Sequence, residues 1–265
     1  MPEPMTVAID AARAAGKQLL ESFEGVATGV DAKSSHTDLV SDADRESETV
    51  IVSAIRWAFP EDAIVAEEGS LEPGGSGRTW YIDPLDGTIN YLYGVPHWAV
   101  VLCLADKDGA LSGVVYDPVR DELFGAERGA GAWVSRAGGS ARPLRTTEAR
   151  ELRSALVATG FAYVAKDRVE QARILTRVLG EVRDLRRNGS AALDLSWVGA
   201  GRFDGYFESV DQPWDWMAGA LIVREAGGRV TELKQKRSGH PHIVASAPDV
   251  HDPLVALLRR AVQPG

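Results

Sequence analysis

The chain has 265 residues and a formal net charge of −9, and 45% of its residues are hydrophobic. This composition is typical of a globular protein with one large domain or two smaller ones, and the negative charge argues against a nucleic-acid or anionic-membrane surface. One cysteine, Cys103, excludes an internal disulfide and fits a reducing compartment. No apolar run approaches 18 residues and no signal peptide is recognisable, so we expect a cytoplasmic protein.

The N-terminal part of the chain is expected to form two helices joined by a polar connection at residues 33–38. Apolar residues recur every four positions in residues 6–24, which indicates an amphipathic helix; they are Val7, Ala11, Ala15, Leu19 and Phe23. Ser41, followed three residues later by Asp44, indicates a capping box at the start of the second helix. Pro60 is expected to end that helix.

A short strand is predicted at residues 63–66, and Glu67 and Glu68 follow it directly. Because neighbouring side chains on a strand point to opposite faces, only one of the two can face a given site, and we expect Glu67 to do so. Residues 71–78 are rich in Gly and Pro but lack the Gly-Lys-Ser/Thr sequence of a phosphate-binding P-loop. They are expected to form a mobile loop beside the site.

The sequence Trp-Tyr-Ile-Asp-Pro-Leu-Asp-Gly-Thr-Ile-Asn, residues 80–90, predicts a short strand that runs into an acidic turn. Pro84 fixes one φ angle and Gly87 permits an unusual one, so the turn can direct Asp83, Asp86 and a backbone carbonyl to one point. Hard cations such as Mg²⁺ prefer this set of oxygen ligands. The alternative interpretation is an Asx-type turn, in which the Asp side chains cap their own backbone.

Further strands are expected before the middle of the chain. Residues 98–105 are too apolar for a half-exposed strand and are expected to be buried on both faces, with Cys103 as a small buried hydrophobe. Three short strands separated by turn-forming residues indicate an antiparallel meander; they lie at residues 111–116, 122–126 and 132–134. The polar segment 136–150 suggests a boundary between an N-terminal α+β subdomain, residues 1–147, and a C-terminal α/β subdomain, residues 148–265.

The second half of the chain alternates between predicted strands and helices. The strands are expected at residues 155–159, 183–187, 203–208, 229–233 and 243–246, and the helices at residues 168–179, 190–198, 214–226 and 251–262. This alternation indicates a sheet whose faces are covered by helices.

Acidic residues at predicted strand ends, turns and helix starts could gather around one cavity; they are Asp44, Glu67, Asp83, Asp86 and Asp215. Their carboxylates would repel one another unless cations neutralise them. Oxygen-only ligands favour Mg²⁺ or Mn²⁺ over zinc. The histidines lack the supporting Cys or acidic residues of a competing metal site. We interpret His36, His97 and the pair His240 and His242 as structural or surface residues, and His251 as the start of the last helix.

Two segments resemble signatures of the inositol monophosphatase family of Mg²⁺-dependent sugar-phosphate phosphatases. Asp-Pro-Leu-Asp-Gly-Thr-Ile-Asn, residues 83–90, is similar to the first signature, and Trp-Asp-Trp-Met-Ala-Gly, residues 214–219, to the second. The pair Glu67-Glu68, and Lys33 followed eleven residues later by Asp44, also fall in that family's order. The resemblance implies an α+β fold layered as α-β-α-β-α, with an antiparallel N-terminal sheet and a mixed C-terminal sheet.

The resemblance also implies how the acidic residues share the metal ions. Glu67, Asp83 and the Leu85 carbonyl would hold one Mg²⁺, and Asp83 would bridge to a second ion held with Asp86 and Asp215. A third, weaker ion would lie near Glu67, which gives two or three ions per site. Most of these ligands belong to the N-terminal subdomain.

The resemblance assigns catalysis to Asp44, Thr88 and Glu67, because Asp44 and Thr88 would orient the attacking water beside the metal ions. From the residues alone, the commoner reason for an acid such as Asp44 in the first turn of a helix is that it favours the helix dipole. The backbone amides of Gly87 and Thr88 can donate to a phosphate if this turn opens a helix. Lys33 would offset negative charge near the metal ions and the phosphate.

The resemblance implies that Gly189, Ser190 and Ala191 at a helix start, and Glu208 at a strand end, contact the hydroxyl groups of a polyol. Alternatively, Ser190 is simply a helix-start residue and Glu208 a surface acid. Asn90 favours the inositol-phosphate branch, so we expect a homodimeric, lithium-sensitive phosphatase of inositol 1-phosphate or a similar small phosphate ester. A fructose-1,6-bisphosphatase or broad sugar phosphatase is the nearest alternative. A regulatory binding protein with the same fold is less favoured, because every proposed catalytic position holds a competent residue.

Overall fold

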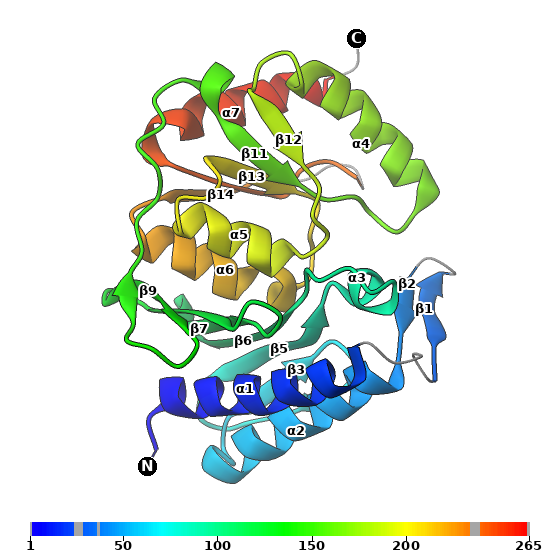
Figure 1. Cartoon of the computed structure of the whole chain (residues 1–265), viewed down its shortest axis with the longest axis vertical. Coiled ribbons are helices and arrows are strands. Elements are labelled where there is room, and N and C mark those ends of the chain that lie inside the picture. The colour runs from blue at the N-terminus through cyan, green and yellow to red at the C-terminus, as the bar shows by residue number, and fades with distance from the viewer. Residues whose placement is uncertain (1, 24–28, 36–37, 234–238, 264–265) are drawn as a thin grey trace.

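The computed structural model describes residues 2–23, 29–35, 38–233 and 239–263. It does not describe the side chains of residues 32–40. Helices and sheets alternate in five layers (Figure 1). Helices α1 (Pro4–Phe23) and α2 (Asp42–Ala58) cover one face of the first sheet, α5 (Ala191–Gly199) and α6 (Pro213–Glu225) lie between the sheets, and α4 (Ala165–Val178) and α7 (Pro248–Ala261) cover the second sheet. The expected α-β-α-β-α fold is therefore confirmed.

The first sheet has eight strands in the order β10-β9-β8-β7-β6-β5-β3-β4. Their bounds are β3 (Ala63–Ala66), β4 (Leu71–Glu72), β5 (Thr79–Asp86), β6 (Ala99–Asp106), β7 (Gly109–Asp117), β8 (Glu122–Glu127), β9 (Gly131–Arg136) and β10 (Arg142–Pro143). All neighbouring strands are antiparallel except β3 and β5, which are parallel. The expectation of an antiparallel N-terminal sheet is therefore wrong, because the chain returns through β4 and the following loop before β5 begins.

The second sheet has five strands in the order β12-β11-β13-β15-β14. Their bounds are β11 (Leu156–Thr159), β12 (Asp184–Arg186), β13 (Gly205–Glu208), β14 (Arg229–Glu232) and β15 (Ile243–Ser246). Strand β11 is parallel to β12 and β13, whereas β15 is antiparallel to β13 and β14, so this sheet is mixed as expected. The first sheet ends at Pro143 and the second begins at Leu156; the boundary at residue 147 stays a prediction, since α6 also contacts the first sheet.

Strand β6 shows how the layers share the first sheet. Trp98, Val100 and Leu102 belong to the apolar cluster under α1 and α2, while Val101 and Cys103 belong to the cluster under α5 and α6. The prediction that this segment is buried on both faces is confirmed. Cys103 is fully buried, and burial raises the pKa of its thiol to about 12, which fits a buried hydrophobe.

Gly113 on β7 allows α6 to approach the first sheet closely, because a Cβ at this position would lie 2.9 Å from the Ala218 Cα. Helix α6 starts with Pro213, a residue suited to the first helical turn because it has no N–H to leave unpaired. Asp215 lies in that first turn, one turn before Ala218. The close packing of α6 therefore fixes where Asp215 stands relative to the sheet.

Two predicted connections have more structure than expected. Residues Asp31–Ser35 and Asp38–Val40 form the antiparallel strands β1 and β2 rather than a plain polar connection. The loop after β4 lies at the start of β3, where Gly75 and Ser76 N–H groups donate to the Glu61 carbonyl at 2.9 and 3.0 Å. The expectation that this loop lies beside the site is wrong, because Glu67 follows the opposite end of β3 and no residue of the loop lines the site cavity. Among the described helices, none is long and apolar enough to cross a membrane.

Candidate active site

The predicted acidic turn is part of strand β5, which continues to Asp86. Pairing between β5 and β6 shifts its register between Asp83 and Asp86, where Pro84 has no N–H to contribute. One Asp83 oxygen, Oδ1, accepts a hydrogen bond of 2.9 Å from the Leu85 N–H, the contact of an Asx-type turn. The same carboxylate lines a cavity, so the Asx contact does not withdraw Asp83 from the site.

A cavity of about 510 Å³ opens where β3, β5, β13 and the starts of α5 and α6 meet. Most residues predicted for the site line it: Glu67, Asp83, Leu85, Asp86, Gly87, Thr88, Gly189, Ala191, Glu208 and Asp215. Asp44 and Ser190 do not line it. Lys33 lies on β1, and its side chain is outside the described part of the structure, as is all of His36. The described histidines do not line the cavity either.

Three carboxylates form the centre of this site. Oxygens of Glu67, Asp83 and Asp215 all lie within 4.8 Å of one another. The parallel pairing of β3 and β5 brings Glu67 beside Asp83, and the first turn of α6 adds Asp215. Burial, and then the negative charges of Glu67, Asp86 and Asp215, hold the pKa of Asp83 well above its usual range. A site of oxygen ligands with excess negative charge fits a hard divalent cation such as Mg²⁺.

Asp86 is placed differently from these three. Its Oδ2 accepts hydrogen bonds from the Ser190 hydroxyl at 2.6 Å and the Ala192 N–H at 2.8 Å, and its Oδ1 accepts from the Ala191 N–H at 3.3 Å. Asp86 therefore caps α5 from another part of the chain. Burial raises the pKa of its carboxyl to about 6, and the hydrogen bonds from Ser190 and α5 limit this rise. A metal-ligand role for Asp86 stays a prediction.

Ser190 is only 1% exposed, and its side chain accepts from the Leu193 N–H while its hydroxyl donates to Asp86. This is the helix-start arrangement given as the alternative interpretation of Ser190. The Ser190 hydroxyl is engaged by Asp86, which itself lines the cavity, and a contact between Ser190 and a substrate stays a prediction.

Asp44 joins the start of α2 to the site. Its Oδ2 accepts from the Ser41 N–H at 2.9 Å and from the Ser41 hydroxyl at 2.6 Å, and the predicted capping box is present at the start of α2. Its Oδ1 lies 3.1 Å from the Thr88 hydroxyl, which donates to it or to the Leu85 carbonyl at the same distance. Asp44 is fully buried, so it reaches the cavity only through Thr88. Helix α3 (Thr88–Leu92) begins at Thr88, with Gly87 as its N-cap at φ 101°.

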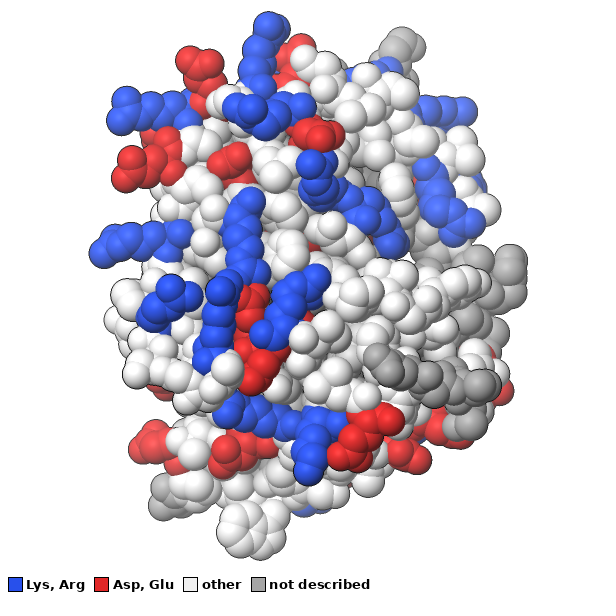
Figure 2. All heavy atoms as spheres, viewed as in Figure 1, with Lys and Arg blue, Asp and Glu red and all other residues white. Residues whose placement is uncertain are grey.

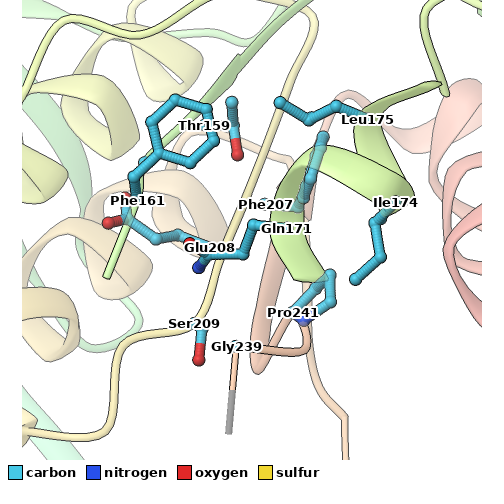
Figure 3. A pocket seen from close by; sticks show the side chains of 11 residues that line it. Thr159, Phe161, Gln171, Ile174, Leu175, Phe207, Glu208, Ser209, Gly239 and Pro241 are labelled. Atoms are coloured by element: carbon cyan, nitrogen blue, oxygen red, sulfur yellow. The ribbon is translucent and has the colours of Figure 1, made fainter. Parts of the chain in front are cut away.

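Glu208, at the end of β13, separates the cavity from a smaller pocket of about 10 Å³ (Figure 3), which is room for about one water molecule. The Tyr206 hydroxyl donates to Glu208 Oε2 at 2.8 Å. Burial raises the pKa of the Glu208 carboxyl to about 7, and Arg187 opposes the rise. Gly160 leaves space for this carboxylate, because a Cβ at Gly160 would overlap both Glu208 oxygens. Glu208 is thus a half-buried residue of the cavity wall, not the surface acid of the alternative interpretation.

Sequence reasoning missed Arg187 as a residue that lines the cavity, and it missed the structural contacts of Asn90. Arg187 lines it and attracts Glu208, but nothing in the local sequence distinguishes Arg187 from the neighbouring Arg186. The resemblance implies that Asn90 marks the substrate preference, and in the structure its amide donates to the carbonyls of His97 at 2.7 Å and Asn188 at 2.8 Å. Asn90 therefore ties the first sheet's loop to the segment before α5 and stands outside the lining of the cavity.

Comparisons with known proteins agree with the fold described above. A family model described as the inositol monophosphatase family matches residues 1–263. The protein named Nus factor SuhB from Vibrio cholerae is 41% identical over 250 residues, which cover 92% of this chain and 91% of that protein. The crystal structure of extragenic suppressor protein suhB from Bartonella henselae has a TM-score of 0.85 at 36% identity and covers 98% of both chains. The Thermotoga maritima IMPase has a TM-score of 0.84 at 33% identity and covers 97% of both.

Asp83→Asn is expected to stabilise the protein in excess chelator at pH 8. The raised pKa means that the folded state holds a charge there at a cost that the unfolded chain does not bear, while Asn keeps an oxygen for the Leu85 N–H. We expect a rise of at least about 3 °C in Tm, equivalent to roughly 1 kcal/mol at this chain length. The gain should shrink as the pH falls, because the wild type then takes up the proton and regains stability.

The measurement is thermal unfolding followed by circular dichroism between pH 8 and pH 5.5. Asp62→Asn is a matched control, because Asp62 is an equally buried carboxylate that instead has cationic and neutral donors, Arg78 and Trp80. It should lose stability under the same conditions. A lower Tm for Asp83→Asn than for the wild type would show that the Asx-turn contact outweighs the repulsion.

Proposed function

The chain belongs to the inositol monophosphatase family, and on this premise we propose that it is a Mg²⁺-dependent phosphomonoesterase that releases phosphate from inositol 1-phosphate or a similar polyol phosphate. The observation that carries this proposal is the group of Glu67, Asp83 and Asp215, whose oxygens lie within 4.8 Å of one another in a cavity large enough for such a substrate. Mutual repulsion destabilises a partly buried acidic cluster of this kind at neutral pH unless cations neutralise it.

Two or three Mg²⁺ ions would be held by Glu67, Asp83, Asp215, the Leu85 carbonyl and Asp86. Mn²⁺ could take the place of these Mg²⁺ ions. Bound metal ions would supply an activated water and neutralise charge on the phosphate. The amides of Gly87 and Thr88 stand at the cavity wall, where they can donate to phosphate oxygens. Arg187 also lines the cavity and adds a positive charge, which favours an anionic substrate.

Thr88 and Asp44 would orient the attacking water. When the Thr88 hydroxyl donates to Asp44 Oδ1, its oxygen lone pairs are free to accept a hydrogen bond from a water in the cavity. Asp44 is held on its other oxygen by Ser41, so it cannot rotate away from Thr88 without losing two hydrogen bonds. The pair would thereby align the water with the phosphorus atom while remaining outside direct contact with the substrate, apart from the Thr88 oxygen.

Substrate recognition would rest on Glu208, Gly189 and Ala191, which line the cavity beyond the acidic cluster. The Glu208 carboxylate, held by Tyr206, would accept hydrogen bonds from ring hydroxyls. We further propose that Li⁺ inhibits the protein and that it is a cytoplasmic homodimer. We propose no nucleic-acid or membrane partner. Fructose-1,6-bisphosphatase or broad sugar-phosphatase activity is the alternative within the same mechanism.

A regulatory role is a second candidate function, favoured by the name Nus factor SuhB carried by a relative with 41% identity. The face seen in Figure 2 carries side chains of both charge signs, so it offers charged contacts despite the net charge of −9. A catalytically inactive Asp83→Asn variant separates the candidates. If the variant restores the wild-type phenotype to a strain that lacks the gene, a partner-mediated role is favoured. If only the active protein restores it, hydrolysis is the function responsible for the phenotype.

The proposed hydrolysis is tested by initial rates on inositol 1-phosphate, fructose 1,6-bisphosphate and nitrophenyl phosphate, each with Mg²⁺ and with excess chelator. Activity should disappear with the chelator and return with Mg²⁺. Asp83→Asn should lower kcat at least about a hundredfold, because metal stabilisation of the transition state contributes several kcal/mol. Full activity in chelator would refute the mechanism, and a wide preference for fructose 1,6-bisphosphate would establish the alternative substrate.

Glu208→Gln should lower kcat/KM for inositol 1-phosphate by about ten- to a hundredfold, the effect of losing a charged hydrogen bond. A site built to bind hydroxyls rejects ligands that lack them, so nitrophenyl phosphate should be affected far less. Gly160→Ala should reproduce this pattern, because its methyl group would displace the Glu208 carboxylate. Equal losses on both substrates would mean that Glu208 supports the metal site or the fold instead.

A further inference from the structure

Helix α2 buries a face that is polar in its first half and apolar in its second. The buried residues follow one stripe along the helix: Asp44, Ser47, Glu48, Ile51 and Ile55. Ile51 and Ile55 join the apolar cluster under the first sheet, as an amphipathic helix requires. The three polar residues face the site instead. Asp44 reaches Thr88, the Ser47 hydroxyl donates to the Pro84 carbonyl at 2.9 Å, and Glu48 contacts the turn that follows β3.

Glu48 accepts three hydrogen bonds from that turn. The Glu68 N–H donates to its Oε2 at 2.7 Å, and the Ser70 N–H and hydroxyl donate to its Oε1 at 3.0 and 2.6 Å. The side chain is buried, with 5% of its surface exposed. Other groups of the turn pair with each other, since Ala66 N–H donates to the Ser70 carbonyl and Gly69 N–H to the Ala66 carbonyl. The Glu48 carboxylate therefore satisfies the donors that the turn cannot satisfy itself.

These contacts act on Glu67 through the backbone. The Glu68 N–H belongs to the same planar peptide unit as the Glu67 carbonyl, so a hydrogen bond to this N–H fixes the plane on the C-terminal side of Glu67. On the other side, the Glu67 N–H donates to the Ile82 carbonyl of β5 at 3.1 Å. With both flanking peptides held, the direction of the Glu67 Cα–Cβ bond toward Asp83 and Asp215 is set by Glu48 and β5 together.

We propose that Glu48 is a positioning residue that orients Glu67 for metal binding without touching the metal ions or the substrate. This inference rests on the proposed function in that it assumes a divalent cation at Glu67, Asp83 and Asp215. It assigns the polar half of the α2 face to the support of the site, with one side chain for each of its parts: Asp44 for Thr88, Ser47 for the Pro84 bulge, and Glu48 for Glu67.

Direct metal binding tests the proposal without reference to turnover. Titration calorimetry with Mg²⁺ and with Mn²⁺ is carried out on the wild type and on Glu48→Gln, and Tm is measured in excess chelator. Gln keeps the shape of the side chain but presents an amide NH₂ to at least one donor of the turn. We expect Kd to rise about tenfold or more, the range found when groups that orient metal ligands are removed. Saturating Mg²⁺ should restore most of the wild-type kcat.

Two further variants keep the result interpretable. Ser70→Ala removes one of the three hydrogen bonds and leaves the carboxylate in place, so it should weaken binding in the same direction but less, and it serves if Glu48→Gln does not fold. Asp62→Asn is the matched control, because Asp62 is a buried carboxylate that holds the loop at the opposite end of β3. It should lower Tm while Kd stays within about twofold, as expected for a distant site.

The outcomes separate the proposal from the function on which it rests. A wild type that binds neither cation contradicts the proposed function itself. A wild type that binds, together with a Glu48→Gln variant whose Kd is unchanged and whose Tm alone falls, contradicts the positioning role and leaves the metal site intact. If Asp62→Asn weakens binding as much as Glu48→Gln, the effect follows general stability and the specific role of Glu48 is refuted.

Discussion

The burial of several carboxylates around one cavity is the constraint on which the rest of the structure depends. Asp83 is 2% exposed and faces the negative charges of Glu67, Asp86 and Asp215. Among the described residues that line the cavity, Arg187 is the one cation. Its charge lowers the pKa of Glu208 and is not among the causes that shift the pKa of Asp83. Such a cluster opposes folding unless a divalent cation binds it. The protein therefore gives up stability at this place, and the surrounding layers must supply it.

The parallel pairing of β3 and β5 brings two of these carboxylates together. Parallel strands run in the same direction, so Glu67, which directly follows β3, comes beside Asp83 in β5. An antiparallel pair would have put the two acids at opposite ends. Helix α6 brings Asp215 to the same edge because Gly113 allows it to lie close to β7, and the two sheets thereby share one site.

Periodicity within a segment predicted much of the fold, and contacts between distant segments account for what it could not predict. The stripe of α1 and the double burial of β6 are local patterns, and both were found. The parallel partner of β5 and the hydrogen bond from Ser190 to Asp86, 104 residues earlier, depend on how the chain returns, which no local pattern specifies. The ligand group Glu67, Asp83 and Asp215 was reached through resemblance to a family, because single acids at strand ends are common. Glu48 left a readable local signal: a buried-stripe position, four residues after Asp44 and three before Ile51, held by an acid where an apolar residue is expected.

The structural and functional interpretations of these acids are compatible because a carboxylate has two oxygens. Asp44 uses Oδ2 for the start of its own helix and Oδ1 for Thr88, so one residue both caps α2 and serves the site. Asp83 gives Oδ1 to the Leu85 N–H and still lies within the acidic cluster. A capping contact fixes the rotation of the whole side chain, and this aims the remaining oxygen more sharply than packing alone. Local backbone hydrogen bonds are thus the means by which this fold orients charged groups that repel one another.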